Sequence, residues 1–404
     1  MRIEKNNIFY GIDWILVILY VTLVGFGWVN IYATTTSVNN SEILDLSTRY
    51  GKQLLWIILC VPLIILILFF NSKFYEKFAS ILYFISILSL AGLFLFGKNI
   101  NGATSWYNFG FMGLQPSEFA KAFTALALAK LLSDRQYNLK LIKNQIKAFI
   151  IIFLPALLIA LQPDLGSVLV YLSFFFVLNR EGLTLNYIIL GSLAIILLLT
   201  LLFGPSTIII IVFTVLSIIV FYYLRRNKGY FKFNWFKILG IYVVFGIYIF
   251  SSGYIFNNVF EQHQRDRFEI LLGLSKDTKK IGYNTNQSLQ AISSGGGFGK
   301  GFLQGDRTQG NFVPEQDTDY IFSTVGEEWG FLGSSLVIIL FMLLLYRIIY
   351  LAETHKNKFG RIYGYSLASI LFFHVVINIG MVTQLLPTVG IPLPFFSYGG
   401  SSLW

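Results

Sequence analysis

Residues 277–322 read DTKKIGYNTNQSLQAISSGGGFGKGFLQGDRTQGNFVPEQDTDYIF, and this polar run determines how the rest of the chain is organised. It belongs to a longer stretch, 259–322, that is rich in glycine and charge, whereas most of the sequence around it is apolar. Loops this long are uncommon unless they are functional or disordered. The Tyr, Phe, Val and Ile spread through it argue against simple disorder. We therefore expect a structured loop that carries the polar chemistry of the protein.

The overall composition is that of a helical membrane protein. Of 404 residues, 55% are hydrophobic and only 12% are charged, roughly half the charged share of a soluble domain. The single cysteine, Cys60, excludes an intramolecular disulfide and a cysteine-based metal site. The net charge of +10 falls in short clusters between apolar runs. That pattern is typical of loops at an anionic membrane surface and argues against nucleic-acid binding.

Apolar runs of about 17–25 residues predict an all-α polytopic integral membrane protein with about eleven transmembrane helices. The first run is too long for the core of a signal peptide, so we interpret it as a retained anchor. The predicted spans are 9–33, 53–71, 78–97, 117–133, 147–162, 167–179, 187–203, 206–224, 238–256, 331–351 and 362–386.

The distribution of Lys and Arg predicts the orientation of these spans. With the N-terminus inside, basic clusters fall in the inner loops, whereas the short outer loops hold only Arg49, Lys52 and Lys98. The long polar stretch is then extracytoplasmic, where ATP is absent. This predicts N-terminal transmembrane helices (1–256), a large extracytoplasmic loop (257–320) and C-terminal transmembrane helices (321–404).

Within the loop, Asp277 is surrounded by cations at 265, 267, 276, 279 and 280. One carboxylate among cations suits a base or ligand beside a polyanionic substrate, and it equally suits a solvated charged loop. The run 293–301, SSGGGFGKG, fits either an anion-binding backbone assisted by Lys300 or a flexible turn. Carboxylates at 315, 317 and 319 either hold a divalent cation or cap a helix that begins near Asp319.

Ionisable residues also occur inside the predicted spans, where they are functional hypotheses by default. Glu118 and Lys121 are three residues apart and can pair on one helix face, with Pro116 in the first turn, where a helix tolerates proline. They either serve function or only set helix packing. His374 and Asn378 are expected to form hydrogen bonds between helices.

Together these segments resemble the SEDS family (shape, elongation, division and sporulation proteins). The resemblance covers nearly the whole chain, and the run GGGFGKGFLQGDRTQ at 295–309 is more similar to the elongation branch than to the division branch. The motifs, in order, are NGATSWYNFGFMGLQPSEFAK (101–121), QPDLGS (162–167), QRDRFEILL (264–272), GYNTNQSLQAISSGGGFGKG (282–301), FVPEQDTDYIFSTVGEEWGFLG (312–333) and NIGMVTQLLPTVGIPLPFFSYGGSS (378–402).

This resemblance implies a peptidoglycan glycosyltransferase of the bacterial inner membrane that polymerises lipid II, with its N-terminus in the cytoplasm. The implied partners are a class B penicillin-binding protein (a transpeptidase), other cell-elongation membrane proteins and membrane lipids, with no nucleic acid. The resemblance identifies no definite cofactor, and a divalent cation (Mg²⁺ or Mn²⁺) could assist. A lipid II flippase and a non-enzymatic scaffold for the penicillin-binding protein are the alternatives that the sequence leaves open.

The resemblance also implies site residues. The family's catalytic aspartate lies in a D-P-x-G-x-G-Y run, and here the matching run, DTKKIGY at 277–283, keeps the aspartate and the final Gly-Tyr but lacks the proline and the first glycine. Asp277 is therefore the predicted catalytic base. The predicted substrate-binding residues are Glu118, Lys121, Arg265, Arg267, Lys279, Lys280, Gln287, Ser288 and Lys300.

Two features depart from the family pattern. Relatives usually have one span before the large outer loop where this chain has three, at 187–203, 206–224 and 238–256. The family core of about ten spans thus gains two, which leaves the orientation unchanged. The end of the sequence, SSLW at 401–404, resembles the start of another helix, so we expect the last family span to be missing here.

Overall fold

The computed structural model describes residues 11–35, 45–100, 103–108, 110, 113–184, 187 and 281–403. All of these except Thr184 and Tyr187 belong to one unit of the chain, Met1–Leu183 with Asp277–Trp404, and only this unit is discussed below. Several predicted features lie outside the described residues: the spans at 187–203, 206–224 and 238–256, and the site residues Arg265, Arg267, Asp277, Lys279 and Lys280.

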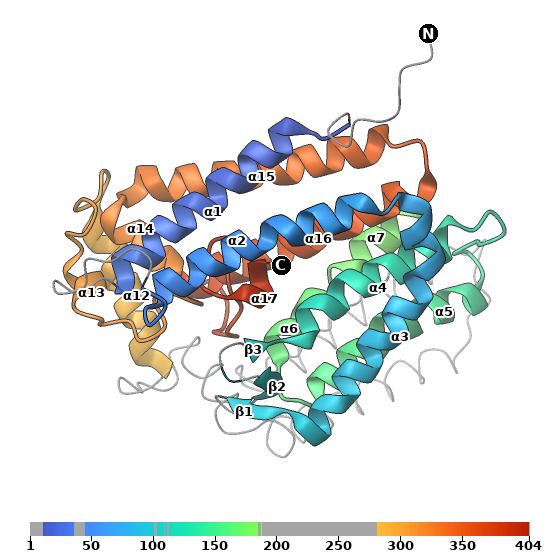
Figure 1. The fold of residues 1–404 in the computed structure, drawn as a ribbon, viewed down its shortest axis with the longest axis horizontal. Coiled ribbons are helices and arrows are strands. Elements are labelled where there is room, and N and C mark those ends of the chain that lie inside the picture. The colour runs from blue at the N-terminus through green and yellow to red at the C-terminus, as the bar shows by residue number, and fades with distance from the viewer. Residues whose placement is uncertain are drawn as a thin grey trace, which may run out of the picture. The chain divides into compact units, whose positions relative to one another are not determined.

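Six of the described helices are long and apolar enough to cross a membrane, and Figure 1 shows their arrangement. They confirm the predicted polytopic membrane fold, whereas the total of eleven spans stays a prediction. The six helices are α1 (Trp14–Thr35), α2 (Arg49–Phe69), α3 (Ser72–Phe96), α5 (Ile142–Ala160), α15 (Gly330–Thr354) and α16 (Lys358–Val382).

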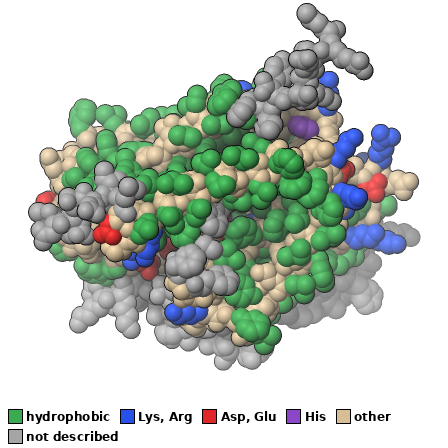
Figure 2. Space-filling model, in the orientation of Figure 1, with side chains coloured by type: hydrophobic (Ala, Val, Ile, Leu, Met, Phe, Trp, Pro, Cys, Tyr) green, Lys and Arg blue, Asp and Glu red, His purple; other side chains and the backbone are tan. Residues whose placement is uncertain are grey.

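The surface of this unit matches a membrane environment. Figure 2 shows apolar side chains over the middle of the visible face and most Lys and Arg side chains at its right-hand end. Leu95, at 80% exposure, and Ile65, at 62%, are large apolar side chains of this kind. Because such residues would expose apolar area to water in a soluble protein, we interpret them as lipid-facing.

Short polar residues set where several of these helices begin. The Thr48 side chain accepts a hydrogen bond from the Gly51 amide at 3.2 Å, and Asn71 accepts one from Phe74 at 3.0 Å. Asn357 caps α16 in the same way. Such caps satisfy N–H groups that a first turn leaves free. Helices α2, α3 and α16 therefore start at 49, 72 and 358, ahead of the predicted 53, 78 and 362, because an apolar run does not include a polar first turn.

Helix α4 (Pro116–Ser133) lies among α3, α5 and α16 and packs against all three. Its alanines at 120, 125, 127 and 129 are buried. Small side chains let helix backbones approach closely, which favours helix association in lipid. The helix matches the predicted span at 117–133, but Glu118, Lys121 and Lys130 make it less apolar than the six helices above.

The span predicted at 167–179 is divided into two short helices, α6 (Leu165–Tyr171) and α7 (Phe174–Arg180). At the break, the amides of Leu172 and Ser173 bond to carbonyls three residues back, at 3.1 and 3.0 Å. This tighter turn interrupts the α-helical pattern. The sequence gives no sign of it, because the apolar run continues across the break.

A small antiparallel sheet follows α3 and adds to the all-α fold. Its strands are β1 (Lys98–Ile100), β2 (Ala103–Asn108) and β3 (Gly113–Leu114), in that order. Lys98 pairs with Trp106, and Tyr107 pairs with Leu114. The Tyr107 hydroxyl donates a hydrogen bond to the Ser89 carbonyl at 2.8 Å, which ties the sheet to α3 just ahead of α4.

The described part of the predicted outer loop is largely structured. It contains α12 (Ile281–Gly295) and α13 (Asp306–Gln309), and α14 (Ile321–Glu328) follows before α15. Helix α12 packs closely on α14: a Cβ at Gly295 would lie 1.9 Å from the Gly326 carbonyl oxygen. Only glycine permits this crossing. A last short helix, α17 (Gly400–Leu403), contacts α2, α4 and β3.

The glycine-rich run after α12 is a close-packed turn. Gly299 has φ +82°, a conformation that favours glycine. The amide of Lys300 donates to the Glu327 carbonyl and that of Gly301 to the Glu328 carbonyl, both at 3.0 Å. Because these amides are already bonded within the protein, the interpretation of this run as an anion-binding backbone is wrong at these positions.

The cap predicted for the helix near Asp319 is also wrong. The N-cap of α14 is Tyr320, which makes no side-chain capping hydrogen bond. Asp317 is buried and pairs instead with Arg49 at 2.5 Å, which joins this segment to the start of α2. Within the ranges that the structure describes, no three His, Cys, Asp or Glu side chains gather to hold a metal ion.

Glu327, at the end of α14, organises the polar segment around it. Its carboxylate is fully buried and accepts hydrogen bonds from the backbone amides of Arg307 (3.0 Å) and Thr308 (2.8 Å) and from the Thr308 hydroxyl (2.8 Å). It also pairs with the Lys300 ammonium at 3.0 Å. Burial raises the pKa of Glu327, but the hydrogen bonds and the ammonium outweigh burial, so that pKa lies below its usual value.

The neighbouring Glu328 is in the opposite situation. It is 1% exposed, and neither carboxylate oxygen has a hydrogen-bond partner in the described part of the chain. Burial is the main cause that raises the pKa of Glu328 to about 7, while weaker contacts lower it. Near neutral pH, Glu327 is therefore ionised, whereas the adjacent Glu328 is about half protonated.

This contrast predicts opposite effects of the same substitution. Glu327→Gln should destabilise the protein by about 2–3 kcal/mol at neutral pH, because it removes charge-assisted hydrogen bonds from buried groups. This stabilisation is present above the ordinary glutamate pKa and is lost as the pH falls through the lower folded-state pKa. Thermal unfolding in detergent from pH 3 to pH 8 (roughly the range of both groups) measures it.

Glu328→Gln should instead raise stability at pH values above about 7, because it removes a carboxylate that folding must desolvate without a partner. Wild-type stability should fall as the pH rises toward that value, and the variant should not show this fall. Asp306→Asn is the control, since Asp306 is 85% exposed and its ion-pair partner among the described residues is Lys300. Equal melting shifts for both glutamate variants would contradict this assignment.

Candidate functional site

Five of the predicted site residues are described, and they fall in two places. Glu118 and Lys121 lie on α4, inside the helical bundle. Gln287 and Ser288 lie on α12, and Lys300 lies in the turn that follows it. The catalytic candidate Asp277 and its four neighbouring cations lie outside the described residues.

The first turns of α4 form the predicted ion pair. Pro116 occupies the first helical position, where a missing N–H costs nothing. Glu118 and Lys121 follow on one face, and the Lys121 Nζ lies 2.7 Å from Glu118 Oε2. The ion pair expected from the spacing is therefore confirmed. Its two members differ in burial, because the side chain of Lys121 is 2% exposed and that of Glu118 is 15% exposed.

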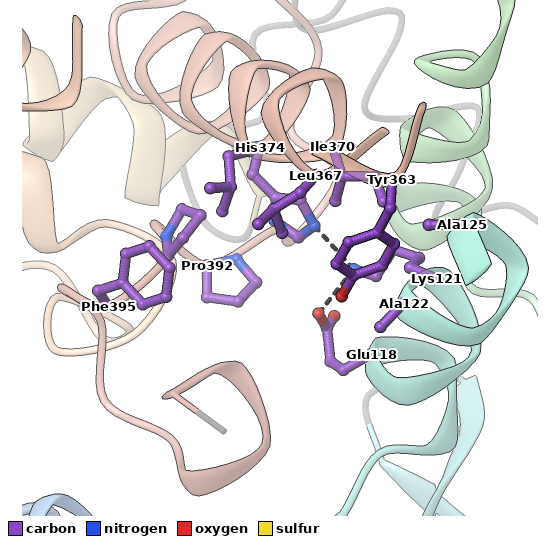
Figure 3. Close-up of a pocket in the computed structure, with 12 residues that line it drawn as sticks. Glu118, Lys121, Ala122, Ala125, Tyr363, Leu367, Ile370, His374, Pro392 and Phe395 are labelled. Atoms are coloured by element: carbon purple, nitrogen blue, oxygen red, sulfur yellow. Dashed lines mark hydrogen bonds and ion pairs between the residues drawn. The ribbon is translucent and has the colours of Figure 1, made fainter. Parts of the chain in front are cut away.

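A histidine from the C-terminal half of the chain completes this cluster. The Lys121 Nζ lies 2.7 Å from Nε2 of His374 on α16, and His374 is 5% exposed. Figure 3 shows Glu118, Lys121 and His374 facing one another across the gap between α4 and α16. The expected helix-to-helix bond of His374 is thus confirmed, but its partner was not foreseen, because the two residues are far apart in sequence.

These three residues line a cavity of about 130 Å³ between the helices. The rest of its lining is almost entirely apolar. Figure 3 shows Pro392 and Phe395, from the segment after α16, on one side and Tyr363 on the other. The full lining is Glu118, Lys121, Ala122, Ala125, Tyr363, Leu367, Ile370, Leu371, His374, Pro392, Pro394 and Phe395.

The hydrogen-bonding capacity of Lys121 is only partly used. An ammonium has three N–H donors and no acceptor. One donor faces Glu118 and one faces His374, and no third partner occurs among the described residues. A buried cation with a remaining donor beside an apolar cavity can bind an anionic oxygen that is attached to an apolar group.

Neighbouring polar groups hold the start of α4 in place. Asp164 accepts hydrogen bonds from the Gln115 amide group at 3.2 Å and from the Ser167 amide at 3.0 Å. The hydroxyls of Ser117 and Ser167 lie 3.3 Å apart. The sequence segments QPSE and QPDLGS therefore pack together, and they fix the turn from which Glu118 projects.

Asn378, one turn after His374, has a different environment. Its side-chain amide donates to the carbonyls of Asp319, at 2.8 Å, and Ile391, at 2.7 Å. It is fully buried. The helix-to-helix hydrogen bond expected of Asn378 is therefore wrong: Asn378 joins α16 to two irregular segments, whereas His374 joins α16 to α4.

The candidates on α12 and its turn make structural contacts. Lys300 pairs with Asp306 at 2.9 Å and with Glu327. Gln287 accepts a hydrogen bond from the Arg307 guanidinium. The Ser288 hydroxyl is buried and donates to the Val382 carbonyl at 3.1 Å, which joins α12 to the end of α16. Their role in substrate binding stays a prediction.

A family model described as a cell cycle protein, covering FtsW, RodA and SpoVE, matches residues 13–230 and 193–404. The peptidoglycan glycosyltransferase RodA of Treponema pallidum is 32% identical over 430 residues, which cover 100% of this chain and 96% of that protein. The peptidoglycan glycosyltransferase MrdB of Escherichia coli K12 is 34% identical over 332 residues, covering 82% of this chain and 75% of that protein.

Solved structures agree with this assignment. One is a chain of a peptidoglycan synthase complex that coordinates polymerization and crosslinking, with a TM-score of 0.71 and 27% identity, covering 97% of this chain and 94% of that chain. Another is a mutant of the rod shape determining protein RodA of Thermus thermophilus, with a TM-score of 0.62 and 25% identity, covering 97% and 93%. The motifs, the bundle and these full-length similarities place the chain in the SEDS family of polytopic membrane proteins.

Proposed function

We propose that this protein is an inverting peptidoglycan glycosyltransferase that polymerises lipid II into β-1,4 glycan strands for cell elongation and rod shape. The observation that carries this proposal is the full-length similarity to the RodA of Treponema pallidum, which is named a peptidoglycan glycosyltransferase. The mostly apolar cavity with one buried ammonium adds support. It suits a phosphate group that is joined to a lipid.

The proposed reaction transfers a glycan at its anomeric carbon. The 4-hydroxyl oxygen of the acceptor sugar attacks that carbon, and the bond from the carbon to the pyrophosphate oxygen breaks with its electron pair. The hydroxyl proton passes to the carboxylate of Asp277, which acts as general base. Pyrophosphate is already a good leaving group, so no general acid is required, and attack from the opposite face inverts the α-linked donor to a β-1,4 bond.

Cations near Asp277 in the sequence have a separate role in this proposal. Arg265, Arg267, Lys279 and Lys280 would offset the negative charge that grows on the departing pyrophosphate. Lys121 would bind an oxygen of the same group from within the membrane. A divalent cation, Mg²⁺ or Mn²⁺, could share this task, but the described residues supply no cluster of ligands for it, so no step depends on it.

The membrane setting and the partner follow from the same similarities. The protein is a multi-pass membrane protein, and we place it in the bacterial inner membrane with its N-terminus in the cytoplasm, in line with the positive charge of the inner loops. The synthase complex similar in structure combines polymerization with crosslinking. We therefore propose a class B penicillin-binding protein, which is a transpeptidase, as the partner.

The role of Asp277 can be tested with one substitution. Asp277→Asn keeps the shape of the side chain and removes the base, so the variant should insert and purify normally but form no glycan polymer from lipid II. Purified protein with its partner transpeptidase, lipid II and gel analysis of the glycan products gives the measurement. Asp45→Asn, in another predicted outer loop, is the control and should polymerise normally.

Near-native polymerisation by the Asp277→Asn variant would rule out this residue as the base. If neither the wild type nor the variant polymerises but both move lipid II across a vesicle membrane, the protein is a flippase. Failure in both assays, with the partner's transpeptidase still dependent on the protein, would indicate a scaffold.

The pair Glu118 and Lys121 can be tested by exchange. Glu118→Lys combined with Lys121→Glu restores an ion pair of reversed direction, so it should recover much of the thermal stability lost in either single variant. If Lys121 binds substrate pyrophosphate, the exchanged protein should remain inactive, because the cation now lies at the wrong position. Melting temperature and polymerisation are measured on the same samples. Recovery of both would show that the pair serves only packing.

A further inference from the structure

The buried lysine has two partners of different charge. Lys121 lies 2.7 Å from a carboxylate oxygen of Glu118 and 2.7 Å from Nε2 of His374. With Lys121 charged, its ammonium only donates hydrogen bonds, so in this arrangement Nε2 of His374 accepts one and carries no proton. The ring proton of a neutral imidazole then sits on Nδ1. In this cluster His374 is therefore neutral.

The neutrality of His374 matters when an anion enters the cavity. With Glu118 ionised and Lys121 charged, the pair has no net charge, so a further anion would be buried without a counter-charge. If the anion replaces Glu118 on the ammonium, the charge is balanced again. A neutral histidine repels neither Glu118 nor the entering anion when either is paired with Lys121. A second carboxylate at that position would repel the anion.

The two partners of Lys121 differ in burial, because Glu118 is more exposed than His374. The side chain of Glu118 is 15% exposed and lies in the first turn of α4. His374 is 5% exposed and sits in the middle of α16, a helix of 25 residues that packs against α4, α7 and α15. Glu118 is therefore the partner that an entering anion can replace on the ammonium, whereas His374 stays packed between helices.

We propose that His374 is a positioning residue that holds the Lys121 ammonium in the cavity while an anionic phosphate oxygen of the substrate takes the place of Glu118. This inference rests on the proposed function, because it assigns the anion to the pyrophosphate of the lipid-linked sugar. His374 does not touch the reacting atoms. It acts through Lys121 by keeping one donor occupied and the remaining donors directed toward the ligand.

The test compares substitutions that keep or remove the acceptor. His374→Gln supplies an amide oxygen within reach of Lys121, and His374→Leu keeps an apolar side chain of similar bulk but no acceptor. We expect His374→Leu to raise the KM for lipid II about tenfold or more, with kcat changed by less than about threefold. His374→Gln should keep KM within about threefold of wild type. The assay uses the full chain with its partner transpeptidase.

Asn378→Leu is the matched control for a purely structural role. Asn378 lies one turn away, and its partners in the described part of the chain are backbone carbonyls, so its loss should lower the melting temperature without a selective effect on KM. If His374→Leu fails to fold, His374→Asn replaces it, because its amide is one methylene too short to reach Lys121. Equal KM values for the Gln variant and either short variant would overturn the proposal.

A measurement without turnover checks the protonation state. The protein has three histidines, so ¹⁵N-labelled histidine gives few signals, and those missing from His374→Gln belong to His374. We expect the shifts of a neutral ring protonated at Nδ1, both without ligand and with inorganic pyrophosphate added. A charged ring would overturn the inference. If the wild-type protein makes no polymer, both the proposed function and this inference are wrong. If the wild type polymerises lipid II and the His374 variants have the same KM as the wild type, only this inference is wrong.

Discussion

Burial of the Lys121 ammonium constrains more of this structure than any other interaction described. A charge inside a helical bundle is costly unless it is paired, and its two partners come from different parts of the sequence. Glu118 reaches it because the two residues are three apart on one face of α4. His374 reaches it only because α16 packs directly on α4. The close approach of these two helices, aided by the buried alanines of α4, is therefore a condition for keeping the lysine charged.

In the polar segment from α12 to α14, the buried charge is a carboxylate. Glu327 is fully buried, pairs with Lys300 in the turn after α12 and accepts hydrogen bonds from the start of α13. This arrangement explains why a glycine-rich, apparently flexible sequence has a defined structure. The turn must approach α14 so closely that a Cβ at Gly299 would lie 2.1 Å from the Glu328 carbonyl oxygen. The glycines allow this close packing, and the charged Glu327 side chain joins the turn after α12 and the start of α13 to α14.

Some parts of the fold could be predicted from sequence and others could not, for identifiable reasons. Apolar runs located the membrane helices because lipid exposure demands them, and the spacing of Glu118 and Lys121 predicted their pair because it is local. The break between α6 and α7 left no mark in an apolar run. The partner of His374 and the contacts of Glu327 depend on tertiary packing, which one sequence does not reveal. The function rested on motif resemblance rather than on geometry, and the proposed base Asp277 lies outside the described residues.

Helix α16 connects the cavity at α4 with the polar segment from α12 to α14. His374 faces the cavity at α4, and Asn378, one turn later, holds the backbone at Asp319 and Ile391. At the end of the same helix, the Val382 carbonyl accepts a hydrogen bond from Ser288 on α12. These three contacts along one helix fix the distance between the cavity at α4 and the start of the polar segment at α12. A lipid-linked substrate has its pyrophosphate between an apolar chain and a polar sugar, so a transferase for it needs a fixed spacing of this kind between its lipid-facing site and its polar site.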